Sequence, residues 1–565
     1  MTNEPREAMN ELKNNKNGFL YTALGAVFLS TAMLPSTSSA TLSWEVGDGV
    51  KVDFTNTLRY SAATRVDKRD SELLQNPNLD DGNQNFSTGL ISNRFELYSE
   101  LDVVSDQGFG ARVSALGLYD TVYNDDNDNP GFPKAFPNHT SRDYDEFTDD
   151  TRDQHGRYAE IRDAFVFGRL ALGDTQLSGR LGQHSLVWGE SLFFANNAIA
   201  GAQSPFDTPR LLIDPTAEAK EFVLPVPQIS GQWELSDTLS LGAYYQFRHR
   251  ENRIPAVGSY FSYSDIVGEG AERLLLGMGP AGPMAAVRES DMDPDDSGQF
   301  GLQLRWQLGE TDLGLYALRF HDKDLQQVMR LGFDPAIGGV RPTSYYLTYH
   351  EDTTLYGISA SRSMGDFNVA AEGSIRKDQS LASSHAVDTS ALGGPASGNN
   401  NHPAYAVGDT AHINLSTIWS VPSTPLWGEA NLVAELAWTR LLHCEQNCDT
   451  ALDPNATRDS WSMRGVFKPT YRQVVSGLDL SVPIGIGYTP KGSRNILGPW
   501  AVPAEDGGDF TIGLTGLYMN ELELGLAYTH FFGSTGELMD ESLSYSYQQA
   551  RKDRDFVAFT AKYSF

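Results

Sequence analysis

Four side chains in the segment 175–190 could contact a solute or take part in proton transfer. Arg180, His184, Trp188 and Glu190 all stand at even-numbered positions, which places them on one face of a strand. One interpretation makes them part of a polar pore lining. The other makes them a network of paired charges that braces the wall of a sheet. The sequence leaves both interpretations open.

Histidines could also supply the general base of a serine hydrolase. His184, His321 and His530 lie in or near segments that alternate like strands, but no Gly-x-Ser-x-Gly motif accompanies them. We therefore expect the chain not to be an enzyme. A hydrolase that uses serine and histidine side chains of the sheet remains the alternative.

The segment 190–226 is unusually apolar for a connection between strands. It carries Phe193, Phe194, Ile199 and Phe206, and an exposed loop rarely holds so many apolar side chains. We expect this segment to fold inward and to form a constriction. An apolar constriction would favour hydrophobic or amphipathic solutes and slow small ions. The alternative is an outer lid.

Two cysteines and two acidic runs complete the candidate sites. Cys444 and Cys448 are close in sequence and predict a small disulfide in an oxidising compartment. The acidic runs 125–129 and 291–296 could hold divalent cations that bridge to lipopolysaccharide, although neither has the spacing of a dedicated calcium loop. We predict no metal centre and no cofactor. The run 274–278 predicts a short helix or a second inward segment.

The composition restricts the kind of protein that could position these residues. Hydrophobic residues make up 40% of the 565, the net charge is -30 and the mean hydropathy is -0.36. After residue 40 no apolar run is long enough for a membrane-spanning helix. A transmembrane β-barrel is compatible with the absence of such a run, because only every second residue of its strands faces lipid. The negative charge argues against a nucleic-acid partner.

The first 40 residues have the pattern of a secretory signal. Lys13 and Lys16 precede an apolar stretch over 18–34, and the small residues Ser38, Ser39 and Ala40 follow. We expect cleavage after Ala40, which leaves 41–565 as one barrel domain. The alternative is an inner-membrane anchor.

The remaining chain alternates between apolar and polar residues in segments of strand length. Six pairs of segments are joined by very short turns: 91–104 with 109–120, 158–171 with 175–189, 227–235 with 239–249, 298–308 with 313–321, 353–363 with 367–377, and 508–518 with 522–532. Connections near 421–427 and 469–473 join two further pairs. Nine long polar loops lie between the hairpins. This pattern predicts an all-β, antiparallel up-and-down barrel of about 18 strands, with 16 as the other count.

The last strand carries a terminal signature. Tyr563 and Phe565 share one face of the segment 556–565 with other apolar residues. This ending resembles the signal that the outer-membrane β-barrel assembly machinery reads. Short turns would then face the periplasm and long loops the outside.

Two motifs are similar to those of a known family. The run 180–191 (RLGQHSLVWGES) and the segment 213–228 resemble the proteobacterial family called "domain of unknown function 1302", whose members resemble outer-membrane porins. The resemblance implies a Gram-negative outer-membrane location and a role in moving hydrophobic organic compounds. It supplies no functional residues.

Together these observations predict a porin-like channel for the passive passage of small, hydrophobic or amphipathic organic solutes. Expected partners are outer-membrane lipid, lipopolysaccharide, the assembly machinery, the solute, and a periplasmic or inner-membrane transport protein. An energy-coupled receptor is disfavoured, because strands begin about ten residues after the expected cleavage site and leave no room for a plug domain. The alternatives to a channel are the hydrolase and a structural barrel that transports nothing.

Overall fold

A computed structural model describes residues 41–47, 49–213, 219–279, 282–500 and 502–565. The expected signal peptide lies outside these residues. Within them, no helix is both long enough and apolar enough to cross a membrane.

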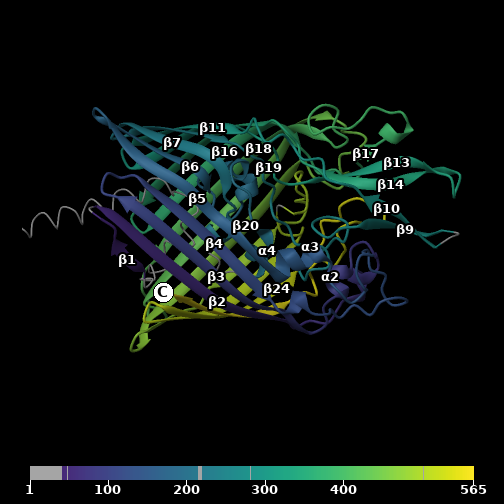
Figure 1. Ribbon diagram of the computed structural model, residues 1–565, viewed down its shortest axis with the longest axis horizontal. Coiled ribbons are helices and arrows are strands. Elements are labelled where there is room, and N and C mark those ends of the chain that lie inside the picture. Colours follow the sequence, from purple (N-terminus) through teal and green to yellow (C-terminus); the bar gives the residue numbers. More distant parts are fainter. Residues whose placement is uncertain (1–40, 48, 214–218, 280–281, 501) are drawn as a thin grey trace, which may run out of the picture.

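The fold is a closed antiparallel barrel (Figure 1). Eighteen strands form its wall, as the sequence predicts; β21 and β22 count as one strand that Val482 and Pro483 interrupt. The last strand pairs with the first, with Tyr563 opposite Leu58. The wall strands are β2 (Val50–Arg65), β3 (Gly89–Ser105), β4 (Gly110–Asp120), β5 (Arg157–Leu172), β6 (Thr175–His184), β7 (Val226–Ser236), β8 (Leu239–Gln246), β11 (Phe300–Leu308), β12 (Thr311–Phe320), β15 (Thr353–Met364), β16 (Phe367–Ser380), β18 (Val407–Val421), β19 (Glu429–Gln446), β20 (Asp459–Val475), β21 (Leu478–Ser481) with β22 (Ile484–Thr489), β23 (Gly507–Tyr518), β24 (Leu522–Phe532) and β25 (Phe556–Ser564).

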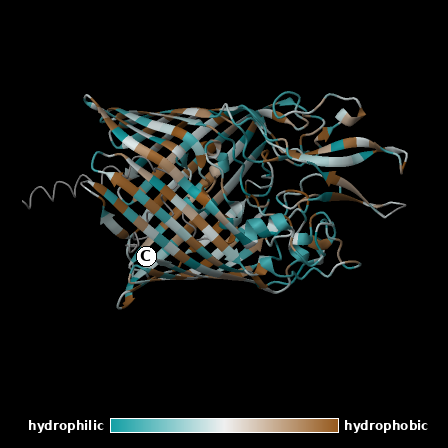
Figure 2. Ribbon diagram, in the orientation of Figure 1, coloured by the Kyte–Doolittle hydropathy of each residue, from teal (hydrophilic) through white to brown (hydrophobic). Residues whose placement is uncertain are grey.

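The wall is apolar outside and polar inside. On β2, Leu58 is 46% exposed while its neighbour Arg59 is 3% exposed, and on β3 the exposed Leu97 follows the buried Glu96. Figure 2 shows the same alternation as a chequered pattern of brown and teal along the strands that face the viewer. Because lipid cannot hydrogen-bond to the backbone, closure of the sheet supplies partners for the wall amides and carbonyls. Apolar side chains outside and polar side chains inside are the reverse of a soluble protein and are typical of a membrane-spanning barrel.

The two ends of the barrel differ. Connections at one end are tight turns, and all the long loops emerge at the other end (Figure 1). One turn differs from the prediction. Residues 469–473 belong to β20, and the chain reverses at Ser476 and Gly477 instead. Gly477 adopts a positive φ of 81°, which a tight turn accepts most readily from glycine.

A short strand, β1 (Leu42–Glu45), extends the closing seam. It pairs with residues 51–54 of β2, whereas β25 pairs with residues 57–65 of the same edge. The backbones of Asn56 and Phe565 exchange two hydrogen bonds of 2.8 Å between these two regions. The edge of β2 that β25 leaves free is therefore covered.

Five further strands form a second sheet beyond the long-loop end of the wall. They are β9 (Arg273–Gly279), β10 (Gly282–Arg288), β13 (Gln326–Asp334), β14 (Gly339–Thr348) and β17 (Val387–Asp388), in the order β17-β13-β14-β10-β9. This outer sheet joins three loops, at the right of Figure 1. The run 274–278 lies in β9, so it is neither a helix nor an inward segment. Its leucines pack against Tyr345 and Leu347 of β14.

The remaining elements are short and lie in the long loops. Aromatic side chains from several loops pack around Phe86, Tyr123 and Tyr260 as a small apolar core above the wall. The helices and helical turns are η1 (Ser71–Leu74), α2 (Asp81–Gln84), η2 (Val122–Asn124), α3 (Asp149–Thr151), η3 (Arg152–Gly156), η4 (Ala195–Asn197), η5 (Ile199–Ala202), α4 (Thr208–Ile213), α5 (Ala219–Phe222) and η6 (Ser390–Leu392).

Candidate functional site

The connection from β6 to β7, residues 185–225, contacts lumen-facing side chains of the wall; we call it the inward segment. Its first half is held by Glu435, in the middle of β19. One oxygen of this carboxylate accepts hydrogen bonds from the backbone amides of Leu192 (3.0 Å), Phe193 and Phe194 (3.1 Å). The other oxygen accepts from Asn414 of β18 at 2.7 Å. A single buried carboxylate thus fixes three successive amides.

A second carboxylate holds the next turn of the chain. Glu372 of β16 accepts hydrogen bonds from the backbone amides of Glu190 (2.5 Å) and Ile199 (2.9 Å). The amide of Asn197 donates to Asn414 at 2.8 Å, and its oxygen meets His412 at 2.9 Å. Hydrogen bonds to charged groups are stronger than neutral ones, so these contacts seat the segment firmly.

The second half of the inward segment binds another part of the wall. Arg210, on α4, donates two hydrogen bonds to Glu96 of β3. Glu221, on α5, accepts two from Arg59 of β2. All four side chains are buried. The segment is therefore anchored to β2 and β3 by ion pairs and to β16, β18 and β19 by its backbone.

These two anchoring regions lie on opposite sides of the barrel. From β3 to β18, nine wall strands intervene in one direction and seven in the other. A segment anchored to both regions crosses the lumen. The barrel interior is thus divided rather than open.

The apolar side chains of the inward segment pack mainly against the wall. Ile199 is fully buried in a cluster with Leu355 and Leu318, and the Trp188 ring lies edge-on to Tyr244 with 5.1 Å between centroids. Phe194 and Phe206 are also buried, and Phe193 is half-buried. The expectation that these residues make an apolar constriction stays a prediction: Ile199 packs against the wall, whereas the Phe206 ring stacks on Phe222 of the inward segment itself, with 6.5 Å between ring centroids.

The structure separates the four candidate lining residues. β6 ends at His184 and not at residue 189, so Trp188 and Glu190 belong to the inward segment, where both are buried. Arg180 remains exposed on the wall, with its guanidinium 5.5 Å from the centre of the Phe165 ring. Of the four side chains, Arg180 alone is exposed.

His184 is hydrogen-bonded between two neighbouring strands of the wall. Its Nε2 lies 2.7 Å from the hydroxyl of Ser230 on β7, and its Nδ1 lies 3.0 Å from the carbonyl of Gly182. A serine beside a histidine is the geometry that a hydrolase would use. Here His184 is 1% exposed, Ser230 is buried, and a carbonyl stands where a catalytic carboxylate would be, so the pair joins two strands.

A cavity of about 490 Å³ lies among the long loops, and Leu224 of the inward segment is part of its lining; we call it the vestibule. Its lining includes eight carboxylates but four basic side chains. Glu160 binds both Arg250 and Arg253, at 2.6 and 2.7 Å, and Asp207 also binds Arg253, at 2.7 Å, so both guanidinium groups are paired with carboxylates. Aromatic side chains complete the lining: Tyr158, Phe261, Tyr263, Tyr349 and Trp500.

The other predicted sites lie away from the lumen. Cys444, near the end of β19, and Cys448 form a disulfide with 5.9 Å between their Cα atoms. Tyr563 and Phe565 are exposed on the outer surface at the short-turn end, with 5.7 Å between ring centroids. Neither acidic run, 125–129 or 291–296, brings three carboxylates together among the described residues.

Sequence reasoning missed the groups that hold the inward segment. Glu372 and Glu435 each follow an alanine, in the sequences AAEG and VAEL, and each is the single charged residue in its stretch, 367–375 and 430–439. An isolated carboxylate on the polar face of a predicted strand needs a partner inside the lumen. That signal was available and points to a segment crossing the barrel.

The closed wall, polar interior and asymmetric ends define a porin-like outer-membrane β-barrel. The chain belongs to the family described as "Protein of unknown function (DUF1302)", whose model matches residues 21–565. No curated protein matches the sequence.

Several solved porin structures are similar over most of their length. They include OccAB2 of Acinetobacter baumannii (10% identity, TM-score 0.42, covering 91% of this chain and 98% of that one) and OccD3 of Pseudomonas aeruginosa (10%, 0.41, 96% and 97%). A third is Pseudomonas aeruginosa OpdK, solved with vanillate (9%, 0.38, 92% and 99%).

Proposed function

We propose that this protein is a passive outer-membrane channel for small organic solutes and that the inward segment limits the size of the solute that passes. Solutes enter through the vestibule, pass the inward segment and leave at the short-turn end. No energy source is needed, because the solute moves down its own gradient.

The anchoring of the inward segment on two opposite sides of the wall carries this proposal. A loop that only covered the mouth of the barrel would have no reason to contact Glu435 and Glu372 in mid-strand. A segment built for structure alone would not need to cross the lumen. Division of a wide barrel by a fixed segment is how a large bore is reduced to the size of one solute.

We further propose that the preferred solutes are amphipathic. The vestibule presents aromatic rings beside carboxylates, so it offers contact surface to an apolar body and attraction to a positive group. Excess carboxylates favour neutral or cationic organic solutes over organic anions of the same size.

Flux through reconstituted protein tests the channel proposal. The purified protein is inserted into liposomes, and swelling is followed with sugars, inorganic salts, organic anions and organic cations of matched size. We expect swelling with small solutes that falls steeply with size. Liposomes that swell no faster than protein-free ones would support the structural-barrel alternative.

Deletion of residues 193–213 tests the role of the inward segment. In planar bilayers we expect the deletion to raise single-channel conductance, because it opens the lumen. Heat-dependent mobility on gels serves as the folding control for the barrel. Unchanged conductance in a folded deletion variant would defeat the size-limiting role.

We also propose that residues 1–40 are removed on export, which leaves 41–565 as the mature barrel. Mass spectrometry of protein purified from outer membranes tests this directly. A mature protein that retains Lys13 and Lys16 would favour the membrane-anchor alternative.

A further inference from the structure

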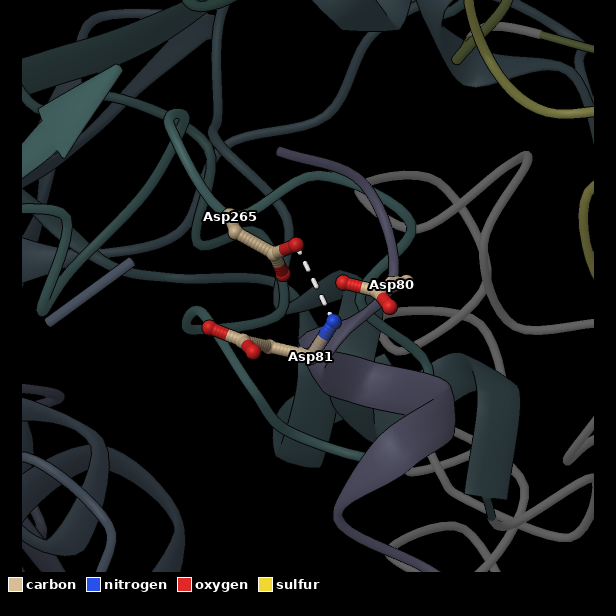
Figure 3. A group of neighbouring side chains, drawn as sticks. All are labelled: Asp80, Asp81 and Asp265. Carbon is tan, nitrogen blue, oxygen red and sulfur yellow. Dashed lines mark hydrogen bonds between the residues drawn. The ribbon is translucent and has the colours of Figure 1, made fainter. Parts of the chain in front are cut away.

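Three buried aspartates from two loops converge at the long-loop end of the barrel. Asp80 and Asp81 lie at the start of α2, and Asp265 lies in the loop between β8 and β9. One carboxylate oxygen of each lies within 4.8 Å of the other two, and the close-up in Figure 3 shows the three side chains together, with the backbone nitrogen of Asp81 donating to the Asp265 carboxylate. None of the three residues is more than 3% exposed.

Each carboxylate has one oxygen with a partner and one without. The Oδ2 atoms accept hydrogen bonds from Gln84 (to Asp80, 3.0 Å), from the backbone of Asn138 (to Asp81, 3.1 Å) and from the backbone of Asp81 (to Asp265, 3.0 Å). The three Oδ1 atoms are buried and have no hydrogen-bond partner. Native proteins rarely leave buried polar atoms unsatisfied.

A third loop contributes an independent observation. Asn138 lies beside Asp81 and Asp265 in the lining of a cavity of about 10 Å³, close to the minimum that one water or small ion requires. Its side-chain oxygen is also buried without a partner, while its nitrogen donates to Asn78 and to the backbone of Arg273. Three residues of this lining, Asp81, Asn138 and Asp265, thus each carry a buried oxygen atom that lacks a hydrogen-bond donor.

The backbone is shaped for this close approach. A Cβ atom at Gly82 would lie 2.4 Å from the carbonyl oxygen of Ser262 and 2.7 Å from that of Ser259. Glycine at position 82 therefore allows α2 to approach the loop that carries Asp265. Any side chain there would separate Asp81 from Asp265.

The protein provides little compensating positive charge. No ion pair joins these aspartates to a basic residue in the described part of the chain. The two nearby guanidinium groups are engaged elsewhere: Arg273 donates to the backbone of Pro137 and Asn138, and Arg554 to that of Tyr260 and Ser262. Burial, and then the neighbouring carboxylate, raise the pKa of Asp81 and of Asp265.

We propose that Asp80, Asp81 and Asp265, together with the side-chain oxygen of Asn138, bind one calcium ion that fastens the loops 66–88, 121–156 and 247–299 to one another. All four donors are oxygen atoms, as calcium requires, and water or backbone carbonyls complete the six to eight ligands that calcium takes. Magnesium suits the site less well, because it retains its own water shell and the cavity is small. The site is independent of the proposed transport function.

Calcium titration of the full-length, detergent-solubilised protein tests the proposal. By calorimetry after EDTA treatment, we expect one calcium ion per chain at a site that is tighter than the weak binding to surface acids. The variants Asp81→Asn and Asp265→Asn each lose this site. The control variant Asp126→Asn lacks one exposed carboxylate of the acidic run 125–129, and we expect it to retain the calcium site.

Hydrogen exchange of the loop amides provides a second measurement, which needs only the wild-type protein. Hydrogen exchange of residues 78–86 and 259–266 is expected to speed up on removal of calcium by EDTA and to recover when calcium is restored, with no change in the wall strands. The absence of a one-to-one site in the wild-type protein would overturn the proposal. So would tighter binding of magnesium than of calcium, or a site that both aspartate variants retain.

Discussion

Glu221 of the inward segment and Arg59 of the wall strand β2 form a buried pair inside the barrel, with hydrogen bonds of 2.8 and 3.0 Å. The two residues are separated by 162 positions in sequence. Their contact fixes one end of a segment whose other end is held by Glu435 on the opposite side of the wall. The position of the inward segment across the lumen therefore depends on these carboxylates rather than on the length of the loop.

The first prediction concerns this pair. Glu221→Gln removes the closer of two carboxylates that Arg59 contacts and leaves Glu96, at 3.7 Å, and loss of one member of a buried ion pair costs about 3 kcal/mol. We expect α5 to detach and the single-channel conductance to rise and fluctuate. Planar-bilayer recordings measure both effects. Glu310→Gln is the control, because Glu310 and Arg362 form an exposed pair at the short-turn end. Recordings of Glu221→Gln that match those of the wild type would contradict the prediction.

The second prediction concerns the three amides that Glu435 holds. Glu435→Gln replaces hydrogen bonds to a charged oxygen by weaker ones, a difference of about 1 kcal/mol for each bond. We expect hydrogen exchange of the amides of 192–194 to accelerate, while the wall amides of β19 stay protected. Glu429→Gln is the matched control on the same strand, because Glu429 is exposed and pairs with Arg472 at the barrel end. Equal hydrogen-exchange protection of the amides of 192–194 in the two variants would show that Glu435 does not anchor the inward segment.

The third prediction is a pH dependence in the vestibule. Lys323 lies in the loop after β12, and burial lowers its pKa to about 8, although Asp322, Asp324 and Glu251 oppose the shift. Above that pH the folded chain has lost a proton that the unfolded chain still holds, so stability rises with pH until the ordinary lysine value of 10.5 is reached. Below about pH 8 Lys323 is charged in both the folded and the unfolded chain, so the free-energy cost of burying its charge does not change with pH.

Loss of this charge should also change ion selectivity. As the pH rises through about 8, the vestibule loses one positive charge and cation selectivity increases. Reversal potentials in a salt gradient measure this change. Lys323→Gln should give the high-pH selectivity at every pH, and a variant that titrates like the wild type would show that another group is responsible.

The fourth prediction tests solute preference. Glu251 and Glu269 are exposed in the vestibule and form no ion pair with a described basic residue. Glu251→Gln combined with Glu269→Gln should lower the flux of an organic cation relative to an organic anion of the same size, and leave a neutral solute unchanged. Swelling rates at low salt measure the ratio, since salt screens exposed charges. An unchanged ratio would place the solute path away from these side chains.

The fifth prediction concerns the disulfide. Cys444 and Cys448 close a very short loop at the rim, so their replacement by serine should lower the free energy of unfolding by no more than about 2 kcal/mol. Conductance should be unaffected, because the bridge lies outside the lumen. Urea titration in lipid and bilayer recordings check the two expectations. A loss of conductance would show that the rim loop contributes to the passage.

The wall could be predicted from the sequence because apolar and polar residues alternate along each strand. Leu58 and Arg59 illustrate this alternation: the residue that faces lipid is apolar, and the residue that faces the lumen is polar. Alternation and tight turns therefore predict the strand count and the closure. The turn at 476–477 was misplaced because Pro469 resembles a strand end, yet it lies within β20.

The interior could not be read in the same way. The approach of Arg210 to Glu96, and of Asp81 to Asp265, depends on how distant loops meet after the barrel has closed. The apolar run around Phe194 and Ile199 did indicate an inward segment. It did not indicate that these side chains turn towards the wall, because periodicity does not identify the partner of an irregular segment.

The pairing of β10 with β14 constrains the order in which the molecule assembles. These two strands are parallel, and the β11–β12 hairpin of the wall lies between them in the chain. Their hydrogen bonds close a long connection, and prior formation of that hairpin shortens the flexible chain that must be closed. We therefore expect the outer sheet to form late. An antibody that recognises both strands together would report completed insertion rather than arrival at the membrane surface.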